Sequence, residues 1–296
     1  MEKQIPQFLN NLLLNQYGEQ IASKILDGYL KKKYVTLRIN RIKANKNEIK
    51  QSLEEIGIKY KEVEWYDDAL IIENATENEI RKMPIYEEGK IYLQNLSSML
   101  PPIILEPKAR ENILDMAAAP GGKTTLIASI MKNEIFITAC DKNKIRAERL
   151  RYNLQKQGVN CANIMTEDAR KLSDYFSFDK ILLDSPCSGS GTTNVFEPDF
   201  SEELIERSTK IQETLLKKAL NILKPGGEII YSTCSILKQE NEEILKKVLK
   251  NNNIQIKPIQ LSNEIPTLPV DIDGTICVCP TKLYEGFFVA KMYKKR

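Results

Sequence analysis

The chain has 296 residues, of which 42% are hydrophobic and 28% are charged, and its formal net charge at pH 7 is +3. These values are ordinary for a globular protein, so any surface for nucleic acid must come from local clustering of charge. The chain has no histidine, which excludes Cys-His and Ser-His catalytic pairs and His-containing metal sites. Its apolar runs are too short to span a bilayer, and its first twenty residues lack the pattern of a secretory signal.

Six cysteines occur without regular spacing. This usage indicates reduced thiols in a cytoplasmic compartment and not a disulfide framework.

The first 95 residues predict a small α+β domain. Residues 1–33 are expected to form helices with a break at Gly18, and residues 45–56 another helix. Strands are expected at 36–40 and 86–93, with a hairpin formed by 63–65 and 69–72. The segment from Lys31 to Lys50 contains eight lysines or arginines and one acid, Glu48. It is interpreted either as a solvated face or as a nucleic-acid contact.

From residue 96 the pattern changes to alternating strands and helices. A short helix over 96–105 is expected to be interrupted near Pro101 and Pro102. The expected strands are 112–116, 134–140, 161–166, 179–183, 227–232, 254–259 and 286–292. The expected helices are 123–132, 143–157, 201–223 and 238–250. Such alternation predicts an α/β domain over 96–296 with a mostly parallel sheet.

The stretch NILDMAAAPGGKTT, from Asn112 to Thr125, places a loop of small residues between a strand and a helix. Small residues allow the backbone to approach a ligand, and the helix start offers N–H donors. A Walker A loop would need glycine where Ala117 stands, so the match to that motif is partial. The loop residues proposed to hold a ligand are Ala117, Ala118, Ala119, Pro120, Gly121, Gly122 and Lys123.

An acid follows each of four successive predicted strands, at Asp115, Asp141, Asp168 and Asp184. An acid after the second strand of such a fold is placed to bind ribose hydroxyls. Four carboxylates would repel a triphosphate without a metal, so this rim suits an uncharged or cationic nucleoside.

Two cysteines follow predicted strands at the same edge. Cys187 comes just after FDKILLDSP and Cys234 just after EIIYST. If the two strands are neighbours, both thiols face one cleft. The alternative interpretation is that both cysteines are packing residues, because cysteine is often buried. Cys140 and Cys161 are expected to be packing residues, and the C-x-C of Cys277 and Cys279 is too small for a metal site.

The paired motifs SPCSGSGT and IIYSTCSI, with TLRIN, QNLSSMLPP, DMAAAPGGKTT and EGFFVAKM, strongly resemble RNA 5-methylcytosine methyltransferases of the Sun type. The resemblance covers residues 35 to 292. It implies a Rossmann-like class I methyltransferase domain with a seven-stranded, mostly parallel sheet, preceded by an N-terminal RNA-binding domain. It also implies S-adenosylmethionine as the methyl donor and RNA, either tRNA or rRNA, as the partner. We expect a monomer that uses neither a metal nor a membrane.

The resemblance implies a role for each site residue. Cys234 is expected to be the nucleophile, with Cys187 assisting removal of the carbon-5 proton and product release. Asp184 would bind the base edge, and Lys123 would act on the same ring or on the thiolate. The loop from Ala117 to Lys123, with Asp141, Asp168 and Asp184, would hold the cofactor, supported by Arg146. Two alternatives remain open, a P-loop-like nucleotide phosphotransferase and a catalytically silent RNA-binding protein.

Overall fold

The computed structural model describes residues 4–250 and 253–296. The chain forms two compact units, which are described separately. The middle unit is Tyr34–Leu172, and the terminal unit combines residues 1–33 with 173–296. The expected boundary at residue 95 stays a prediction.

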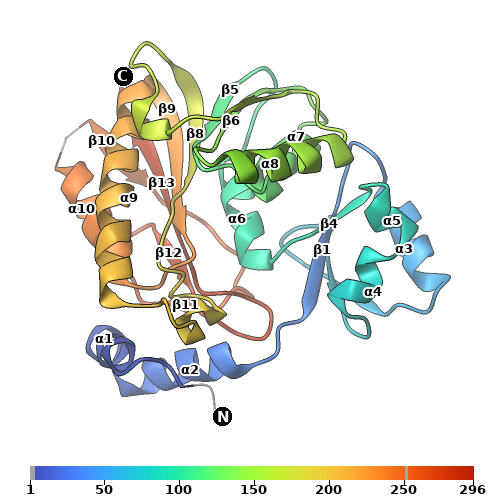
Figure 1. Ribbon diagram of the computed structural model, residues 1–296, viewed down its shortest axis with the longest axis horizontal. Helices are drawn as coiled ribbons and strands as arrows, with labels where there is room; N and C mark the ends of the chain where they lie inside the picture. The colour runs from blue at the N-terminus through green and yellow to red at the C-terminus, as the bar shows by residue number, and fades with distance from the viewer. Residues whose placement is uncertain (1–3, 251–252) are drawn as a thin grey trace. The chain divides into compact units, whose positions relative to one another are not determined.

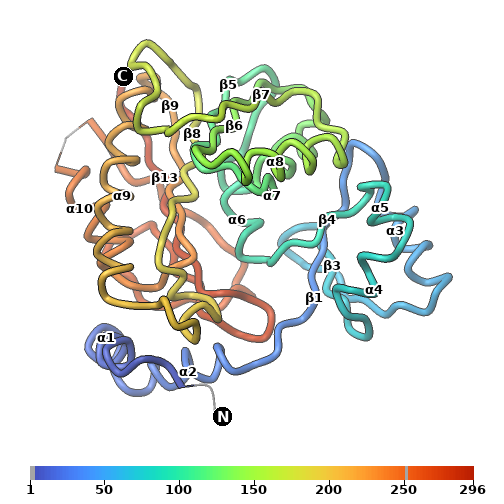
Figure 2. The backbone as a smooth tube through the Cα atoms, viewed as in Figure 1, coloured from blue at the N-terminus to red at the C-terminus, as the bar shows by residue number. Residues whose placement is uncertain are grey.

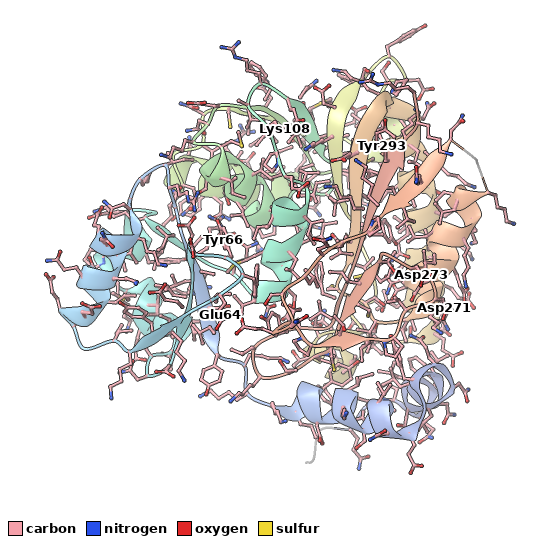
Figure 3. All side chains as sticks on the ribbon, turned by 180° about the vertical axis from the view of Figure 1, so that it is seen from behind. Glu64, Tyr66, Lys108, Asp271, Asp273 and Tyr293 are labelled. Carbon is pink, nitrogen blue, oxygen red and sulfur yellow. The ribbon has the colours of Figure 1, made fainter. Side chains whose placement is uncertain are left out.

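The middle unit begins with a four-stranded antiparallel sheet in the order β2-β3-β1-β4. Its strands are β1 (Val35–Ile39), β2 (Tyr60–Glu62), β3 (Ala69–Ile72) and β4 (Ile91–Leu93), and its helices are α3 (Lys46–Glu54), α4 (Glu77–Arg81) and α5 (Pro84–Glu87). The turn between β2 and β3 carries Glu64 and Tyr66 (Figure 3). Leu37, Ile49 and Leu70 are buried in one core cluster, which joins the sheet to α3.

The rest of the middle unit alternates as expected. It contains α6 (Leu96–Ile104), β5 (Asn112–Asp115), α7 (Gly122–Ile130), β6 (Phe136–Cys140), α8 (Lys144–Lys156), β7 (Ala162–Met165) and η1 (Ala169–Lys171). β6 pairs in parallel with both β5 and β7. Parallel pairing brings the carboxyl ends of these strands to one edge, where the loop after β5 and the residues after β6 and β7 lie together.

The terminal unit contains the first two helices and the last part of the chain. Its helices are α1 (Gln7–Tyr17), α2 (Glu19–Leu30), η2 (Thr193–Phe196), α9 (Glu202–Ile222), η3 (Lys238–Glu240) and α10 (Glu242–Leu249). Its strands are β8 (Phe178–Asp184), β9 (Leu223–Thr233), β10 (Ile254–Lys257), β11 (Thr267–Leu268), β12 (Ile276–Val278) and β13 (Phe287–Lys294). β8 and β9 are parallel, whereas β13 is antiparallel to β9, β10 and β12. α9 runs along β8 and β9, with α10 beside it (Figure 1).

The parallel pairs β5–β6, β6–β7 and β8–β9 and the small N-terminal α+β part confirm the predicted α/β class with a mostly parallel sheet. Among the described residues nine strands, β5 to β13, follow residue 96 where seven were expected, because the short strands β11 and β12 were not predicted. The backbone trace in Figure 2 shows α1 and α2, drawn in blue, beside later segments of the same terminal unit.

Three expectations for the first hundred residues were wrong in detail. The predicted strand over 86–93 begins only at Ile91, because Pro84 stands at the first position of α5 and its ring favours a helix start. α4 was not predicted, although Thr76 and Glu79 form a capping box at its start. α6 is not interrupted at Pro101 and Pro102.

The continuity of α6 has a local explanation. Pro102 has no N–H to donate to the carbonyl of Ser98, four residues earlier. That carbonyl instead accepts a hydrogen bond from Nε2 of Gln94 at 3.0 Å. A side chain therefore replaces one of the backbone hydrogen bonds that the prolines remove.

Candidate active site

Two thiols lie together at the carboxyl ends of neighbouring parallel strands. Asp184, the last residue of β8, is in register with Ser232 near the end of β9. Each strand is followed within three residues by a cysteine. As a result the sulfurs of Cys187 and Cys234, both half-buried, are 3.1 Å apart. The two cysteines therefore face each other as the sequence predicted.

The environment keeps the proton on one of the two sulfurs. The pKa of Cys187 is raised well above its ordinary value, first by its hydrogen bond with Cys234 and then by burial, with Glu240 adding to the effect. A thiol that retains its proton can donate it in a hydrogen bond to a neighbouring thiolate. Cys187 therefore retains its proton and is able to donate it to the sulfur of Cys234.

Asp184 is half-buried at the end of β8 and accepts a hydrogen bond of 2.8 Å from the hydroxyl of Ser232. This contact joins the two strands that carry the thiols and fixes the carboxylate beside them. Its expected contact with a base edge stays a prediction.

Sequence reasoning missed the buried acid that holds the Cys187 loop. Glu240 is fully buried. Its carboxylate accepts from the backbone N–H of Ser188 at 2.8 Å, from the Ser188 hydroxyl at 2.6 Å and from Nε2 of Gln212 at 3.2 Å. The same Gln212 nitrogen donates to the carbonyl of Pro186 at 2.9 Å. The sequence feature that could have pointed to Glu240 is the stretch QENEEIL, which contains it and follows the second thiol motif.

The remaining cysteines have other surroundings. Burial raises the pKa of Cys140 to about 12 and that of Cys161 to about 11. Cys140 donates to the carbonyl of Glu167 at 3.1 Å. Cys277 is buried. The burial of Cys140 and Cys277 fits a packing role, whereas Cys161 is half-buried and its expected packing role stays a prediction.

The loop between β5 and α7 belongs to the middle unit. Gly121 occupies the N-cap of α7 with φ 107°, a left-handed conformation that favours glycine. A Cβ on Gly121 would lie 2.9 Å from Cδ1 of Leu150, so the Leu150 side chain would have to shift to admit any other residue here. Glycine provides no side-chain acceptor for the first N–H groups of α7, as at helix starts that bind anions.

Asp141 and Arg146 form a connected pair beside this loop. Asp141 is 5% exposed, and one carboxylate oxygen accepts from the backbone N–H of Asn143 at 2.9 Å. The other oxygen is 3.3 Å from Nη2 of Arg146, which donates to the carbonyl of Ala119 at 2.7 Å. Arg146 therefore links the acid after β6 to the small-residue loop. A buried, oriented carboxylate beside a loop of small residues fits a ribose.

Two other predicted site residues of the middle unit, Asp168 and Lys123, form hydrogen bonds with nearby side chains. Arg170 donates to both carboxylate oxygens of Asp168 at 2.5–3.1 Å, which lowers the pKa of Asp168 to about 2. Nζ of Lys123 donates to the hydroxyl of Ser98 at 2.9 Å.

Asp115 is more buried than expected for a member of a ligand-binding rim of four acids. It is 1% exposed and accepts from the Thr124 hydroxyl at 2.7 Å. This buried hydrogen bond stabilises the first turn of α7.

Within residues 4–250 and 253–296, no group of three or more His, Cys, Asp or Glu side chains could hold a metal ion. None of the helices in those same ranges is long and apolar enough to cross a membrane.

Known methyltransferases are similar to this chain over most of its length. The model of the 16S rRNA methyltransferase RsmB/F family matches residues 102–293, and a ferredoxin-like domain of RsmF/B-like methyltransferases matches residues 5–79. A tRNA (cytosine(49)-C(5))-methyltransferase of Pyrococcus abyssi is 33% identical over 97% of this chain and 97% of its own length. A probable ribosomal RNA small subunit methyltransferase B of Bacillus subtilis is 31% identical over 98% of this chain.

Other relatives are longer. The chain spans 66% of the Bacillus subtilis protein, and it spans 56% of a ribosomal RNA small subunit methyltransferase F from a Shewanella species. A solved methyltransferase homologue from Pyrococcus horikoshii has a TM-score of 0.86 at 32% identity and covers 98% of this chain and 95% of its own.

Proposed function

This chain belongs to the RsmB/F family of methyltransferases, and from that premise we propose that it methylates carbon 5 of a cytosine in RNA, with S-adenosylmethionine as the methyl donor. The observation that carries the proposal is the pair of thiols 3.1 Å apart, each placed by the end of a parallel strand. A single cysteine would fit a packing role, whereas two facing thiols at a ligand-binding sheet edge fit covalent catalysis.

Carbon 5 of cytosine is a poor nucleophile, and the residues of this chain supply what it lacks. In our proposal the sulfur of Cys234 adds to carbon 6, which converts the ring into an enamine-like nucleophile at carbon 5. Cys187 donates a hydrogen bond to that sulfur before addition, which favours its thiolate. After methyl transfer the carbon-5 proton passes to water with the assistance of Cys187, the electron pair of that C–H bond restores the double bond between carbons 5 and 6, and Cys234 leaves carbon 6 as a thiolate. Asp184, held by Ser232, would bind the base near N3, where charge changes during addition.

When bound, S-adenosylmethionine supplies an electrophilic methyl group on a sulfonium. In our proposal Asp141 binds its ribose hydroxyls, with Arg146 holding both the acid and Ala119. The backbone from Ala117 to Lys123, with Asp168 and Asp184, completes the binding residues. Asp168 would have to share its carboxylate between the ligand and Arg170.

The RNA partner and the cellular setting are proposals as well. Relatives that match this chain act by name on tRNA or on ribosomal RNA, which supports an RNA substrate of one of those classes. We propose an N-terminal RNA-binding domain over 1–95, a monomeric enzyme and a cytoplasmic location. The last is supported by six cysteines that are all free thiols.

A direct assay tests the proposal. Purified protein is incubated with methyl-labelled S-adenosylmethionine and with tRNA or rRNA that lacks the modification, and the digested nucleosides are separated. The proposal expects label in 5-methylcytidine, and bisulfite sequencing of the product then locates the cytosine. Label in another nucleoside, or ATP binding without S-adenosylmethionine binding, would contradict it and favour the phosphotransferase alternative. RNA binding without any label would leave a catalytically silent RNA-binding protein.

A further inference from the structure

We propose that α1 and α2 position the two thiol loops, with Tyr17 and Tyr29 as positioning residues for the reaction. The catalytic part of this inference rests on the proposed function. Both helices belong to the same compact unit as Cys187 and Cys234. The thiol loops are defined as residues 185–192 and 234–238.

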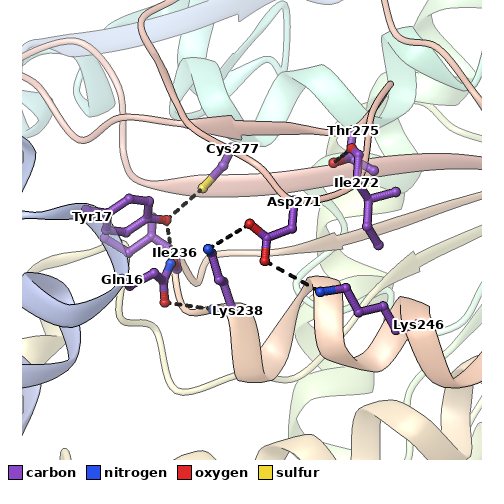
Figure 4. Close-up of polar contacts among 9 residues, drawn as sticks. All are labelled: Gln16, Tyr17, Ile236, Lys238, Lys246, Asp271, Ile272, Thr275 and Cys277. Atoms are coloured by element: carbon purple, nitrogen blue, oxygen red, sulfur yellow. Dashed lines mark hydrogen bonds and ion pairs between the residues drawn. The ribbon is translucent and has the colours of Figure 1, made fainter.

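α1 holds the loop that follows Cys234 (Figure 4). The hydroxyl of Tyr17 donates to the carbonyl of Ile236 at 2.6 Å, and Nε2 of Gln16 donates to the same carbonyl at 2.8 Å. In return, the backbone N–H of Lys238 donates to Oε1 of Gln16 at 3.1 Å. Three hydrogen bonds from two adjacent residues thus fix the backbone just beyond the proposed nucleophile.

α2 holds the loop that follows Cys187. Tyr29 is 3% exposed, and its hydroxyl donates a short hydrogen bond to the carbonyl of Ser190. Burial raises the pKa of Tyr29, so its hydroxyl keeps the proton that it donates. The Tyr29 ring also packs edge-on against Phe196 of η2, just beyond this loop, with ring centroids 6.4 Å apart.

The two loops are also tied to each other. The hydroxyls of Ser190 and Ser235 share a hydrogen bond of 2.7 Å, and the Ile236 N–H donates to the Ser190 hydroxyl at 3.1 Å. The N–H of Gly191 donates to the carbonyl of Cys234 at 2.9 Å. Tyr17 and Tyr29 therefore anchor opposite sides of one connected structure that carries both sulfurs.

This arrangement has a physical consequence. The Tyr29 hydroxyl donates to the carbonyl of Ser190, and Tyr17 supplies one of the two side-chain donors to the carbonyl of Ile236. Loss of a donor to a buried carbonyl would favour rearrangement of the loop. Covalent catalysis is sensitive to small displacements, and a shift of about 1 Å can lower a rate by about a hundredfold. The hydroxyls of Tyr17 and Tyr29 are thus expected to act on the rate of the chemical step through the loops, without touching the substrate.

The test replaces both hydroxyls, in Tyr17→Phe, Tyr29→Phe and the double variant. The matched control is Tyr60→Phe, because Tyr60 donates to Glu54 on α3 of the middle unit. Full-length proteins are compared for kcat and KM with RNA, and for alkylation of each cysteine by iodoacetamide, measured by mass spectrometry. Cys140 is fully buried and serves as an internal reference for global opening.

We expect alkylation of Cys187 and Cys234 to become about fivefold faster in Tyr29→Phe, as for the loss of one typical hydrogen bond, and faster still in the double variant, while Cys140 stays protected. We expect kcat to fall about tenfold or more with KM unchanged, because positioning and not binding is lost.

Equal acceleration at all three cysteines would overturn the proposal, because it would indicate general destabilisation. Unchanged alkylation and unchanged kcat would overturn it too. If the double variant does not fold, the single variants are read by the same criteria. If the unsubstituted protein methylates no RNA, the proposed function fails, and the alkylation pattern alone decides whether the helices position the loops.

Discussion

The sulfur of Cys187 lies 3.1 Å from the sulfur of Cys234, although 47 residues separate them along the chain. Their proximity follows from the parallel pairing of β8 with β9, which ends both strands at the same edge. The raised pKa of Cys187 makes the pair asymmetric, so the two sulfurs are expected to respond differently to substitution.

The first prediction separates the roles of the two thiols. Cys234→Ala should abolish both methyl transfer and any covalent adduct with RNA, because the proposed nucleophile is removed. Cys187→Ala should still form the adduct but release it poorly. This variant should therefore accumulate a complex with RNA that survives denaturing gel electrophoresis and requires S-adenosylmethionine.

Two results would contradict this assignment. Trapping by Cys234→Ala instead would exchange the roles, and full turnover in both variants would leave both cysteines as packing residues. Cys161→Ala is a suitable control, since burial raises the pKa of that thiol to about 11 and it lies outside both motifs.

The second prediction concerns cofactor binding. Asp141→Asn keeps the shape of the side chain but removes the negative charge that would accept from ribose hydroxyls. We expect the affinity for S-adenosylmethionine to fall by about tenfold or more, because hydrogen bonds to charged groups are the stronger class. Isothermal titration calorimetry measures the change. Asp174→Asn, which alters an exposed ion pair with Lys218, should leave the affinity unchanged. Equal affinities in the Asp141 variant and the original protein would count against the proposed site.

The third prediction concerns the basic segment from Lys31 to Lys50, whose charge is less available than its sequence indicates. Arg38 is fully buried and donates to Gln94 and Thr125. Lys46 and Lys50 both pair with Glu62. The exposed cations in this segment include Lys31, Lys32 and Lys43.

Neutralising those three lysines to glutamine should weaken RNA binding and flatten its dependence on salt. Each lost phosphate contact reduces the slope of log affinity against log salt by about 0.7 to 0.9. Lys46→Gln with Lys50→Gln should change the slope less, because Glu62 already neutralises part of their charge. Filter binding over a salt series measures both slopes, and identical slopes in all proteins would show that the segment is only solvated surface.

The sequence was most informative where function depends on short, local patterns. The ends of β5, β6, β8 and β9, and the acids and thiols that follow them, were predicted because apolar runs stop at Asp115, Asp141, Asp184 and Cys234. The antiparallel hairpin of β2 and β3 was predicted within three residues. α5 was mistaken for a strand because Ile85 and Tyr86 favour strands, while Pro84 at the helix start decided the outcome.

Contacts between distant segments could not be predicted. The bond from Tyr17 to Ile236 spans 219 residues, and that from Tyr29 to Ser190 spans 161. Neither tyrosine carries a local pattern that distinguishes it from an ordinary core residue on a helix. Glu240 lies in a local motif, QENEEIL, but its burial and partners follow only from the packing of η3 against the Cys187 loop.

The fourth prediction concerns the pH dependence of stability and the pair formed by Asp168 and Arg170. Hydrogen bonds from Arg170 lower the pKa of Asp168 from 3.8 to about 2 in the folded protein. A carboxyl group with a depressed folded-state pKa stabilises the protein above its unfolded pKa, and that contribution is lost as pH falls from about 4 towards 2. Arg170→Met should remove this contribution. Because the pair is partly exposed, the free energy of unfolding at neutral pH should fall by only about 0.5 kcal/mol.

The measurement is the thermal midpoint followed from pH 6 to pH 2. Glu213 also has a pKa lowered to about 2, by Lys217 and Lys247, so the curve of the unsubstituted protein is a sum of several groups. Only the difference between curves isolates Asp168, and the variant should lose less stability than the original protein over the last two pH units. Arg151→Met is the matched control, because Arg151 pairs with Glu148 in an exposed contact of 3.5 Å. If the curves of Arg170→Met and the original protein are parallel throughout, Arg170 does not hold the Asp168 carboxylate in solution. That acid would then be available to a ligand without competition.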